Sequence, residues 1–161
     1  AVIRSSRKDW RALARKLGLS DKGKAMGGLR EGMGISIEAR EATHKNVYSR
    51  LVFRIDFPTR LGLGLTAMGR VAGKRSLRTL TTGDDVFDER VAVESRQEQR
   101  ALAYLTPERR ACLIELIGTD PRASLDDAGL VWNRNETVTK LAELKQIVDR
   151  LTTAGQTLYP G

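Results

Sequence analysis

Apolar and polar side chains alternate strictly over residues 47–57, and this is the clearest pattern in the chain. Phe53 and Ile55 fall on one side of the stretch, and mainly polar or charged side chains fall on the other. A period of two predicts a half-buried β-strand, which Pro58 ends. A second alternation over residues 35–40 predicts a neighbouring strand, and the short link between the two favours an antiparallel hairpin.

Apolar residues recur at helical spacing in three other places. The first predicted helix follows a capping-box pattern and carries Trp10 and Leu17 on its apolar face, with basic residues around the rest. The second starts at residues 105–108, Leu-Thr-Pro-Glu, with threonine as the N-cap and proline at the first helical position. A leucine-rich stripe predicts a last helix that ends near Ala154.

The intervening segments are shorter and richer in glycine. Residues 18–34 are interpreted as a glycine-rich connector. Residues 61–68 alternate leucine with glycine and are interpreted as a strand whose leucines join the core, with bare backbone on the opposite side. Residues 124–133 predict a small hairpin that turns at Asp127 to Gly129.

Together these elements predict an α+β fold. We expect an N-terminal helix, a mainly antiparallel sheet of about five or six strands, and two later helices packed on one face. Residues 1–33 would form the basic helix and the connector, residues 34–154 a single domain, and residues 155–161 a C-terminal tail. Leu158 and Tyr159 in that tail could either dock on the domain or extend from it.

The composition excludes several classes of chemistry. The chain has one cysteine, Cys112, and one histidine, His44, so it lacks the residues for a structural zinc site or a Cys/His catalytic pair. Gly18 to Lys24 match most of a phosphate loop, but Ala25 stands where Ser or Thr would hold magnesium, and no buried strand precedes it. We therefore expect no cofactor and no bound metal.

The net charge of +8 is unevenly distributed. Residues 1–80 hold 18 Lys and Arg against 6 Asp and Glu, a net charge of +12, whereas residues 81–161 hold 10 against 14, a net charge of −4. A basic half can attract an acidic protein, an anionic membrane surface or nucleic acid, or it can simply keep the fold soluble. The candidate contact residues are the cations of the first helix and of the loop at residues 69–78: Arg7, Lys8, Arg11, Arg15, Lys16, Arg70, Lys74, Arg75 and Arg78.

Carboxylates crowd together only at residues 84–89, where Asp84, Asp85, Asp88 and Glu89 follow a Thr82-Gly83 turn. A carboxylate-dependent enzyme could use such a cluster, but its spacing does not match a calcium loop. The structural interpretation is simpler. Side chains of the turn would bond to nearby main chain, Phe87 would fix the turn to the core, and Asp88 or Glu89 would pair with an arginine such as Arg90 or Arg109. The structural turn would comprise Thr82, Gly83, Asp84, Phe87 and Asp88.

The order of these motifs resembles a known group of proteins. Thr82-Gly83-Asp84-x-x-Phe87-Asp88, an apolar strand and Leu105-Thr106-Pro107-Glu108 follow one another here. Over about residues 34–154 the chain is similar to bacterial proteins of no known activity, in which a TGDxxFD turn precedes a strand and an LTPE-type helix. The resemblance implies a cytoplasmic domain that often follows N-terminal membrane segments. It carries over no catalytic residue.

We therefore expect a non-catalytic interaction or accessory domain, located in the cytoplasm at the face of a membrane, within a larger assembly of protein partners. The first alternative is a module that binds nucleic acid or an anionic surface through the basic half. The second is an enzyme built on the carboxylates of residues 84–89.

Overall fold

A computed structural model describes residues 11–12, 14–21, 25–40, 50–70, 78–118, 122–135 and 141–160. Before the first strand, residues 11–12 and 14–17 are helical. The strands are β1 (Ser20–Asp21), β2 (Ala25–Arg30), β3 (Met33–Arg40), β4 (Arg50–Asp56), β5 (Thr66–Gly69), β6 (Val91–Glu94), β7 (Ser124–Asp126) and β8 (Gly129–Asn135). The later helices are α2 (Asp85–Arg90), α3 (Glu98–Tyr104), α4 (Pro107–Leu116) and α5 (Leu141–Leu158).

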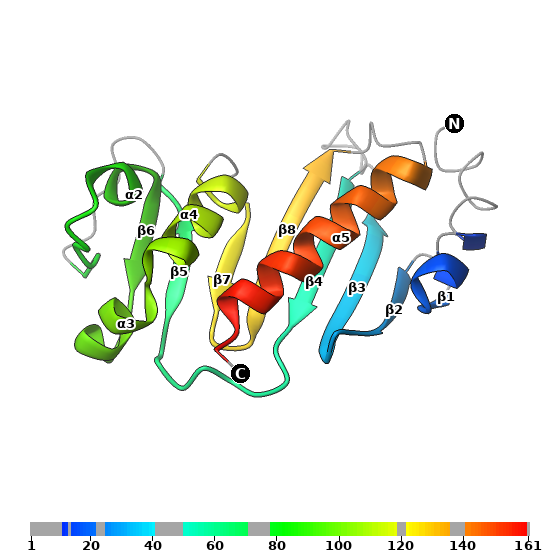
Figure 1. Ribbon diagram of the computed structural model, residues 1–161. Coiled ribbons are helices and arrows are strands. Elements are labelled where there is room, and N and C mark those ends of the chain that lie inside the picture. The colour runs from blue at the N-terminus through cyan, green and yellow to red at the C-terminus, as the bar shows by residue number, and fades with distance from the viewer. Residues whose placement is uncertain are drawn as a thin grey trace.

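The strands form one sheet in the order β1-β2-β3-β4-β8-β7-β5-β6, and every neighbouring pair is antiparallel (Figure 1). The β7–β8 hairpin lies between β4 and β5, although those two strands follow one another in the chain. Residues 57–65 therefore cross the ends of β8 and β7 to reach β5, and we call them the crossing loop.

A row of apolar side chains runs across the sheet and forms the middle of the core. Its members are directly opposite one another on six neighbouring strands, and each is at most 3% exposed: Ile35, Ile55, Leu130, Leu125, Ala67 and Val93. Their burial follows the period of two that the sequence shows on β3 and β4. The predicted hairpin is thus confirmed, with Ile37 opposite Phe53.

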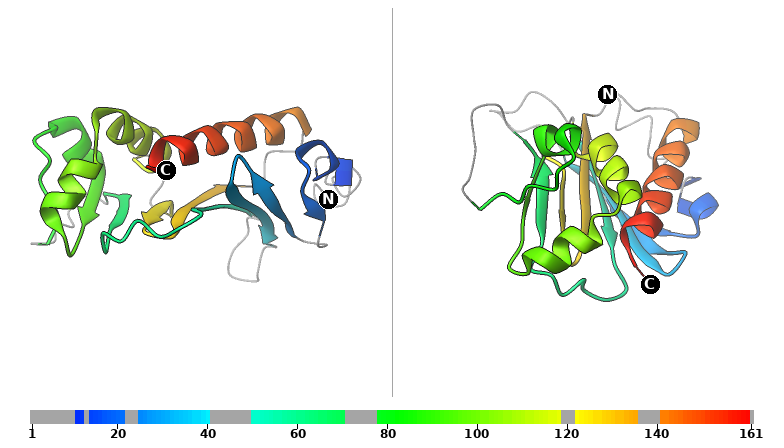
Figure 2. Two further views of the ribbon diagram at one scale, coloured as in Figure 1. Left: turned by 60° about the horizontal axis from the view of Figure 1, so that its bottom comes forward. Right: turned by 60° about the vertical axis from the view of Figure 1, so that its left-hand side comes forward.

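Helices α4 and α5 lie on one face of the sheet (Figure 2). Gly155 allows α5 to approach closely, because a Cβ atom there would lie 2.7 Å from Met33 Sδ and 2.9 Å from Ile55 Cγ2. The sequence pattern suggested that the helix ends before this glycine. Instead α5 continues to Leu158, which is fully buried. The predicted tail therefore docks, and the Tyr159 hydroxyl lies 2.7 Å from Thr59 Oγ1 on the crossing loop.

No helix in the described part of the chain covers the opposite face of the sheet, which we call the open face (Figure 2). A second cross-strand row lies on this face, with side chains that are small apart from those of Arg54 and Met68. It comprises Gly27, Ser36, Arg54, Val131, Ser124, Met68 and Ala92. Arg54 is exposed and Met68 is 46% exposed. The sheet is therefore apolar toward the helices, whereas this row on its open face mixes polar residues with small apolar ones.

The α+β class and the antiparallel sheet agree with the sequence, but the number of elements does not. The described chain has eight strands where five or six were expected, and α2 and α3 add to the two later helices. Part of the difference lies at residues 18–34, which form β1 and β2 and not a connector. Gly28 allows this packing, since a Cβ atom there would lie 2.9 Å from Leu19 Cδ2.

The leucine–glycine segment is also different from its prediction. Leu63 and Leu65 enter the core as expected, but residues 61–65 belong to the crossing loop and not to a strand. Gly62 and Gly64 have φ angles of 73° and 59°, which favour glycine and bend the chain away from an extended path. The link between β3 and β4 lies outside the described residues.

Candidate functional site

The acidic segment at residues 82–90 forms a compact corner at the β6 end of the sheet. Gly83 turns the chain with a φ of 87°, and α2 then starts with Asp84 as its N-cap. The Asp84 carboxylate accepts a hydrogen bond from the Phe87 amide at 3.2 Å, while the Phe87 ring is fully buried. The sequence did not predict this six-residue helix, but it did predict that Phe87 fixes the turn to the core.

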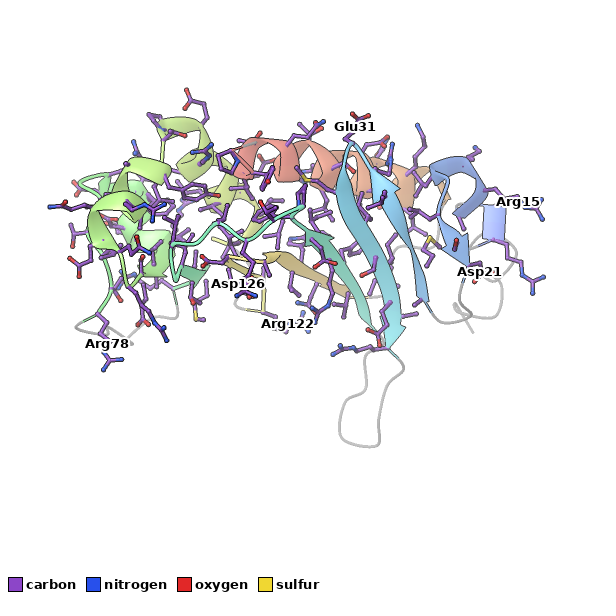
Figure 3. All side chains as sticks on the ribbon, turned by 90° about the horizontal axis from the view of Figure 1, so that it is seen from below. Arg15, Asp21, Glu31, Arg78, Arg122 and Asp126 are labelled. Carbon is purple, nitrogen blue, oxygen red and sulfur yellow. The ribbon has the colours of Figure 1, made fainter. Side chains whose placement is uncertain are left out.

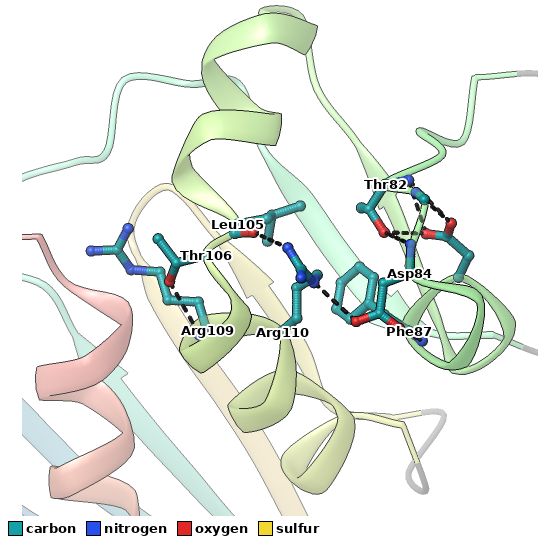
Figure 4. A network of polar contacts seen from close by, with 9 residues as sticks. Thr82, Asp84, Phe87, Leu105, Thr106, Arg109 and Arg110 are labelled. Atoms are coloured by element: carbon teal, nitrogen blue, oxygen red, sulfur yellow. Dashed lines mark hydrogen bonds and ion pairs between the residues drawn. The ribbon is translucent and has the colours of Figure 1, made fainter.

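Asp88 closes the corner from the other side. Its carboxylate accepts hydrogen bonds from the Thr82 amide at 3.1 Å, the Thr82 hydroxyl at 2.8 Å and the Gly83 amide at 3.2 Å (Figure 4). The Thr82 hydroxyl oxygen also accepts a hydrogen bond from the Asp84 amide at 3.2 Å. Asp88 is thus held by local main chain, which is the arrangement expected of a structural turn.

An arginine of α4 joins this corner to the next motif along the chain. Arg110 Nε donates to Asp84 Oδ2 at 3.0 Å, and its Nη1 donates to the Leu105 carbonyl at 2.7 Å. The ion pair that holds this corner therefore joins Asp84 to Arg110. The sequence suggested instead that Asp88 or Glu89 would pair with an arginine such as Arg90 or Arg109. Asp84 and Arg110 belong to the TGDxxFD turn and the LTPE-type helix respectively, so this contact connects the two motifs directly.

The start of α4 also holds the end of α5. Thr106 caps α4 as the sequence predicts, accepting a hydrogen bond from the Arg109 amide at 3.4 Å. Arg109 donates to the Tyr104 carbonyl at 2.8 Å and to the Thr157 carbonyl at 3.0 Å, with its guanidinium 4.5 Å from the Tyr104 ring centre. The Tyr104 hydroxyl donates to the Leu158 carbonyl. These donors satisfy carbonyls at the C-terminal end of α5, where cations are also favoured by the helix dipole.

The corner offers little free chemistry. Asp85 and Glu89 are exposed, whereas the carboxylates of Asp84 and Asp88 accept hydrogen bonds from their own surroundings. In the part of the chain that the structure describes, no three His, Cys, Asp or Glu side chains are grouped so that they could hold a metal ion. The pKa of Asp84 lies below its ordinary value of 3.8, mainly because its carboxylate accepts a hydrogen bond from the Phe87 amide. The hydrogen bond from Arg110 is the second largest cause.

This lowered pKa makes a prediction about acid stability. Because the folded state favours ionised Asp84, the carboxylate stabilises the protein above pH 3.8 and loses that contribution as the pH falls through its lower, folded pKa. Asp84→Asn should keep the helix cap but remove the charge that faces Arg110. Melting temperatures should be lower for this variant at neutral pH, and the difference from the wild type should shrink as the pH falls below 3.8 toward the lowered pKa of Asp84. A difference that does not shrink on acidification would contradict the assignment.

The sequence pattern does not single out Asp127, the most deeply buried carboxylate among the described residues. Asp127, at the turn of the β7–β8 hairpin, is 7% exposed. Its carboxylate accepts hydrogen bonds from the amides of Leu63, Gly64 and Leu65 at 3.1, 2.8 and 2.9 Å. Its carbonyl accepts a fourth from the Leu61 amide at 2.9 Å. The only sequence signal for this contact is the leucine–glycine repeat, whose pairing with a distant aspartate depends on the fold.

The predicted basic contact residues are divided between two ends of the sheet. Arg11, Arg15 and Lys16 are exposed on the helix beside β1, whereas Arg78 lies near β6 (Figure 3). Arg70 is half-buried next to β6, where its amide donates to the Arg90 carbonyl at 2.9 Å. Arg7, Lys8, Lys74 and Arg75 lie outside the described residues. The described cations therefore do not form one continuous basic surface.

Comparison with known proteins gives a fold but no family. No protein-family model matches the chain, and no curated protein sequence matches it. The crystal structure of the mycobacterial trehalose monomycolate transport factor A, TtfA, is similar with a TM-score of 0.54 at 11% sequence identity. The match covers 93% of this chain and 90% of that chain. At this identity the likeness establishes a shared fold alone.

Among the helices in the described ranges, none is both long enough and apolar enough to cross a bilayer.

Proposed function

We propose that this protein is a non-catalytic interaction domain that works as an accessory part of a larger assembly. The observation that carries the proposal is the open face, a broad sheet surface that no helix in the described ranges covers. Its residues come from seven of the eight strands, so the fold presents them on a single rigid support.

The carboxylates give a second line of support. Asp84 and Asp88 hold the corner, and Asp127 holds the crossing loop, so each already has hydrogen-bond donors from the fold itself. A general acid or base needs a carboxyl group that can reach a substrate proton. The alternative of a carboxylate enzyme therefore has less support than an interaction role.

The structural neighbour is consistent with this proposal. TtfA is described as a transport factor for trehalose monomycolate. We take from it the idea of a factor that assists a transport process, and we do not transfer its cargo to this chain. The expected partners of this protein are other proteins of such an assembly.

Two single substitutions can test whether the open face is the contact surface. Met68→Arg places a long cation on that face, where Met68 is 46% exposed. Leu102→Arg makes a similar change on α3, where Leu102 is 40% exposed. Partners recovered by cross-linking and affinity purification from the source cells should be lost at least tenfold with Met68→Arg, a change of about 1.4 kcal/mol in binding, and kept with Leu102→Arg.

The experiment tests both the location of the contact surface and the accessory role itself. If both variants keep the partners of the wild type, the open face is not the contact surface. If the wild-type chain itself cross-links to no protein, the accessory role is wrong.

A further inference from the structure

The first segment of this protein is strongly basic. Residues 1–30 hold nine Lys and Arg against two Asp and Glu, a net charge of +7, whereas residues 31–80 add +5 over a longer stretch and residues 81–161 carry −4. The described residues of this segment form the first helix, β1 and β2, at the outer end of the strand order. The far end of the sheet carries β6 and the acidic corner, together with Arg70 and Arg78. Charges of both signs therefore meet at the far end, whereas the exposed side of the first helix carries cations.

The first helix presents its cations on a fixed support. Ala14 and Leu17 are 2% and 5% exposed in the core, whereas Arg11, Arg15 and Lys16 are exposed. We call these three cations the basic pole. The Leu19 amide donates to the Ala14 carbonyl at 2.9 Å and so holds the end of the helix against the start of the sheet.

Little acidic charge offsets the basic pole. Arg11 lies 3.5 Å from Asp21, with Nε facing Oδ2. Within the described residues, Arg15 and Lys16 make no ion pair or side-chain hydrogen bond. Figure 3 shows Arg15 at the end of the sheet, with its side chain directed away from the domain. An approaching anionic surface could reach these side chains without any rearrangement of the described residues.

We infer that the basic pole binds the phosphates of an anionic lipid surface. The pole is on an outward helix face at the end of the molecule, a shape that a flat membrane can contact. Because Ala14 and Leu17 are already used in the core, the contact would be electrostatic and not a deep insertion of this helix. Single-stranded nucleic acid is less suitable, because aromatic residues make up 5% of the chain and base stacking depends on them.

The expected binding is weak and sensitive to salt. Each Lys or Arg near an anionic membrane strengthens binding about fivefold. Arg15 and Lys16 together should then contribute about 25-fold, and this attraction falls as added salt screens the charges. Such an interaction would orient the domain on a membrane and would need a second contact to hold it there. It extends the proposed accessory role but does not depend on a protein partner.

The test uses the purified chain with vesicles and no other protein. Co-sedimentation should show binding to vesicles made of equal parts phosphatidylglycerol and phosphatidylcholine, little binding to phosphatidylcholine alone, and loss of binding at high salt. Arg15→Glu with Lys16→Glu should weaken binding to the anionic vesicles at least 25-fold. Arg15→Gln with Lys16→Gln provides a milder second pair, in case the acidic pair weakens the end of the helix.

The matched control reverses two exposed arginines away from the basic pole and from the open-face row, Arg60→Glu with Arg100→Glu, and makes the same change in net charge. This control should keep most of the vesicle binding. The inference is overturned if the wild type ignores anionic vesicles, if the control loses as much binding as the variants of the pole, or if duplex DNA binds equally tightly at the same salt. A protein partner that is still captured in those cases would leave the proposed function standing.

Discussion

Replacing Asp127 by alanine should lower the free energy of unfolding by about 4 kcal/mol, because its carboxylate satisfies three main-chain amides of the crossing loop. Two of those hydrogen bonds are buried, so their donors would be left without an acceptor or water. A loss of this size corresponds to a fall in melting temperature of about 10 °C. Urea denaturation and calorimetry would measure both values.

The neighbouring aspartate provides a control of the same chemistry. Asp126 accepts hydrogen bonds from the Ala128 and Gly129 amides at 2.8 and 3.1 Å, and it is exposed. Asp126→Ala should therefore cost only about 1 kcal/mol, because water can replace the lost acceptor. Equal costs for the two alanine variants would show that Asp127 does not hold the crossing loop in place.

Replacing Gly129 by alanine should be at least as damaging, with an expected loss of about 4 kcal/mol or more. A Cβ atom at residue 129 would lie 1.8 Å from the Ile55 carbonyl oxygen, which belongs to the main chain of β4. Main chain cannot move aside as a flexible side chain can, so the pairing of β4 with β8 would have to shift. Loss of protection from hydrogen exchange in β4 and β8 would locate the damage.

Gly32 is the matched control for this substitution. It has a φ of 78° in the β2–β3 turn, but a Cβ atom there would meet nothing within 4 Å. Gly32→Ala should cost only the conformational strain, about 1 kcal/mol. If Gly129→Ala lowers the free energy of unfolding no more than Gly32→Ala does, residue 129 does not approach the main chain of β4 as closely as described.

The elements that could be predicted from sequence are those whose signals are local. The alternation around Phe53 and Ile55 gives β4, and Thr106 followed by Pro107 gives the start of α4. Both patterns reflect rules that involve only neighbouring residues. The α+β class follows from the order of such elements.

Glycine accounts for most of what could not be predicted. Near Gly28 and at Gly155 the sequence pattern predicts an interrupted element, yet each of these glycines lies within a strand or a helix. At both positions a residue from another part of the structure packs so closely that a Cβ atom would collide with it. This residue is Leu19 for Gly28 and Met33 for Gly155. Sequence spacing cannot distinguish a glycine that ends an element from one that permits tight packing.

The candidate sites show the same division. The structural role of Thr82, Asp84 and Phe87 could be anticipated, because an Asx-type turn and a helix cap are local arrangements. The partner of Asp84 could not, since Arg110 is brought to it by the packing of α2 against α4. Asp127 was placed only in a hairpin turn, because its donors lie more than 60 residues earlier in the chain.

The central claim is that this protein works by binding to other components of a larger assembly. Its molecular mass under native conditions tests this claim most directly. The protein would be followed by size-exclusion chromatography with light scattering in a gentle extract of its own cells, at its natural concentration. We predict a species well above the mass that denaturing electrophoresis gives for the same polypeptide, either as a complex with other proteins or bound to membrane fragments. A free monomer of that polypeptide, with no protein or membrane attached, would contradict the account.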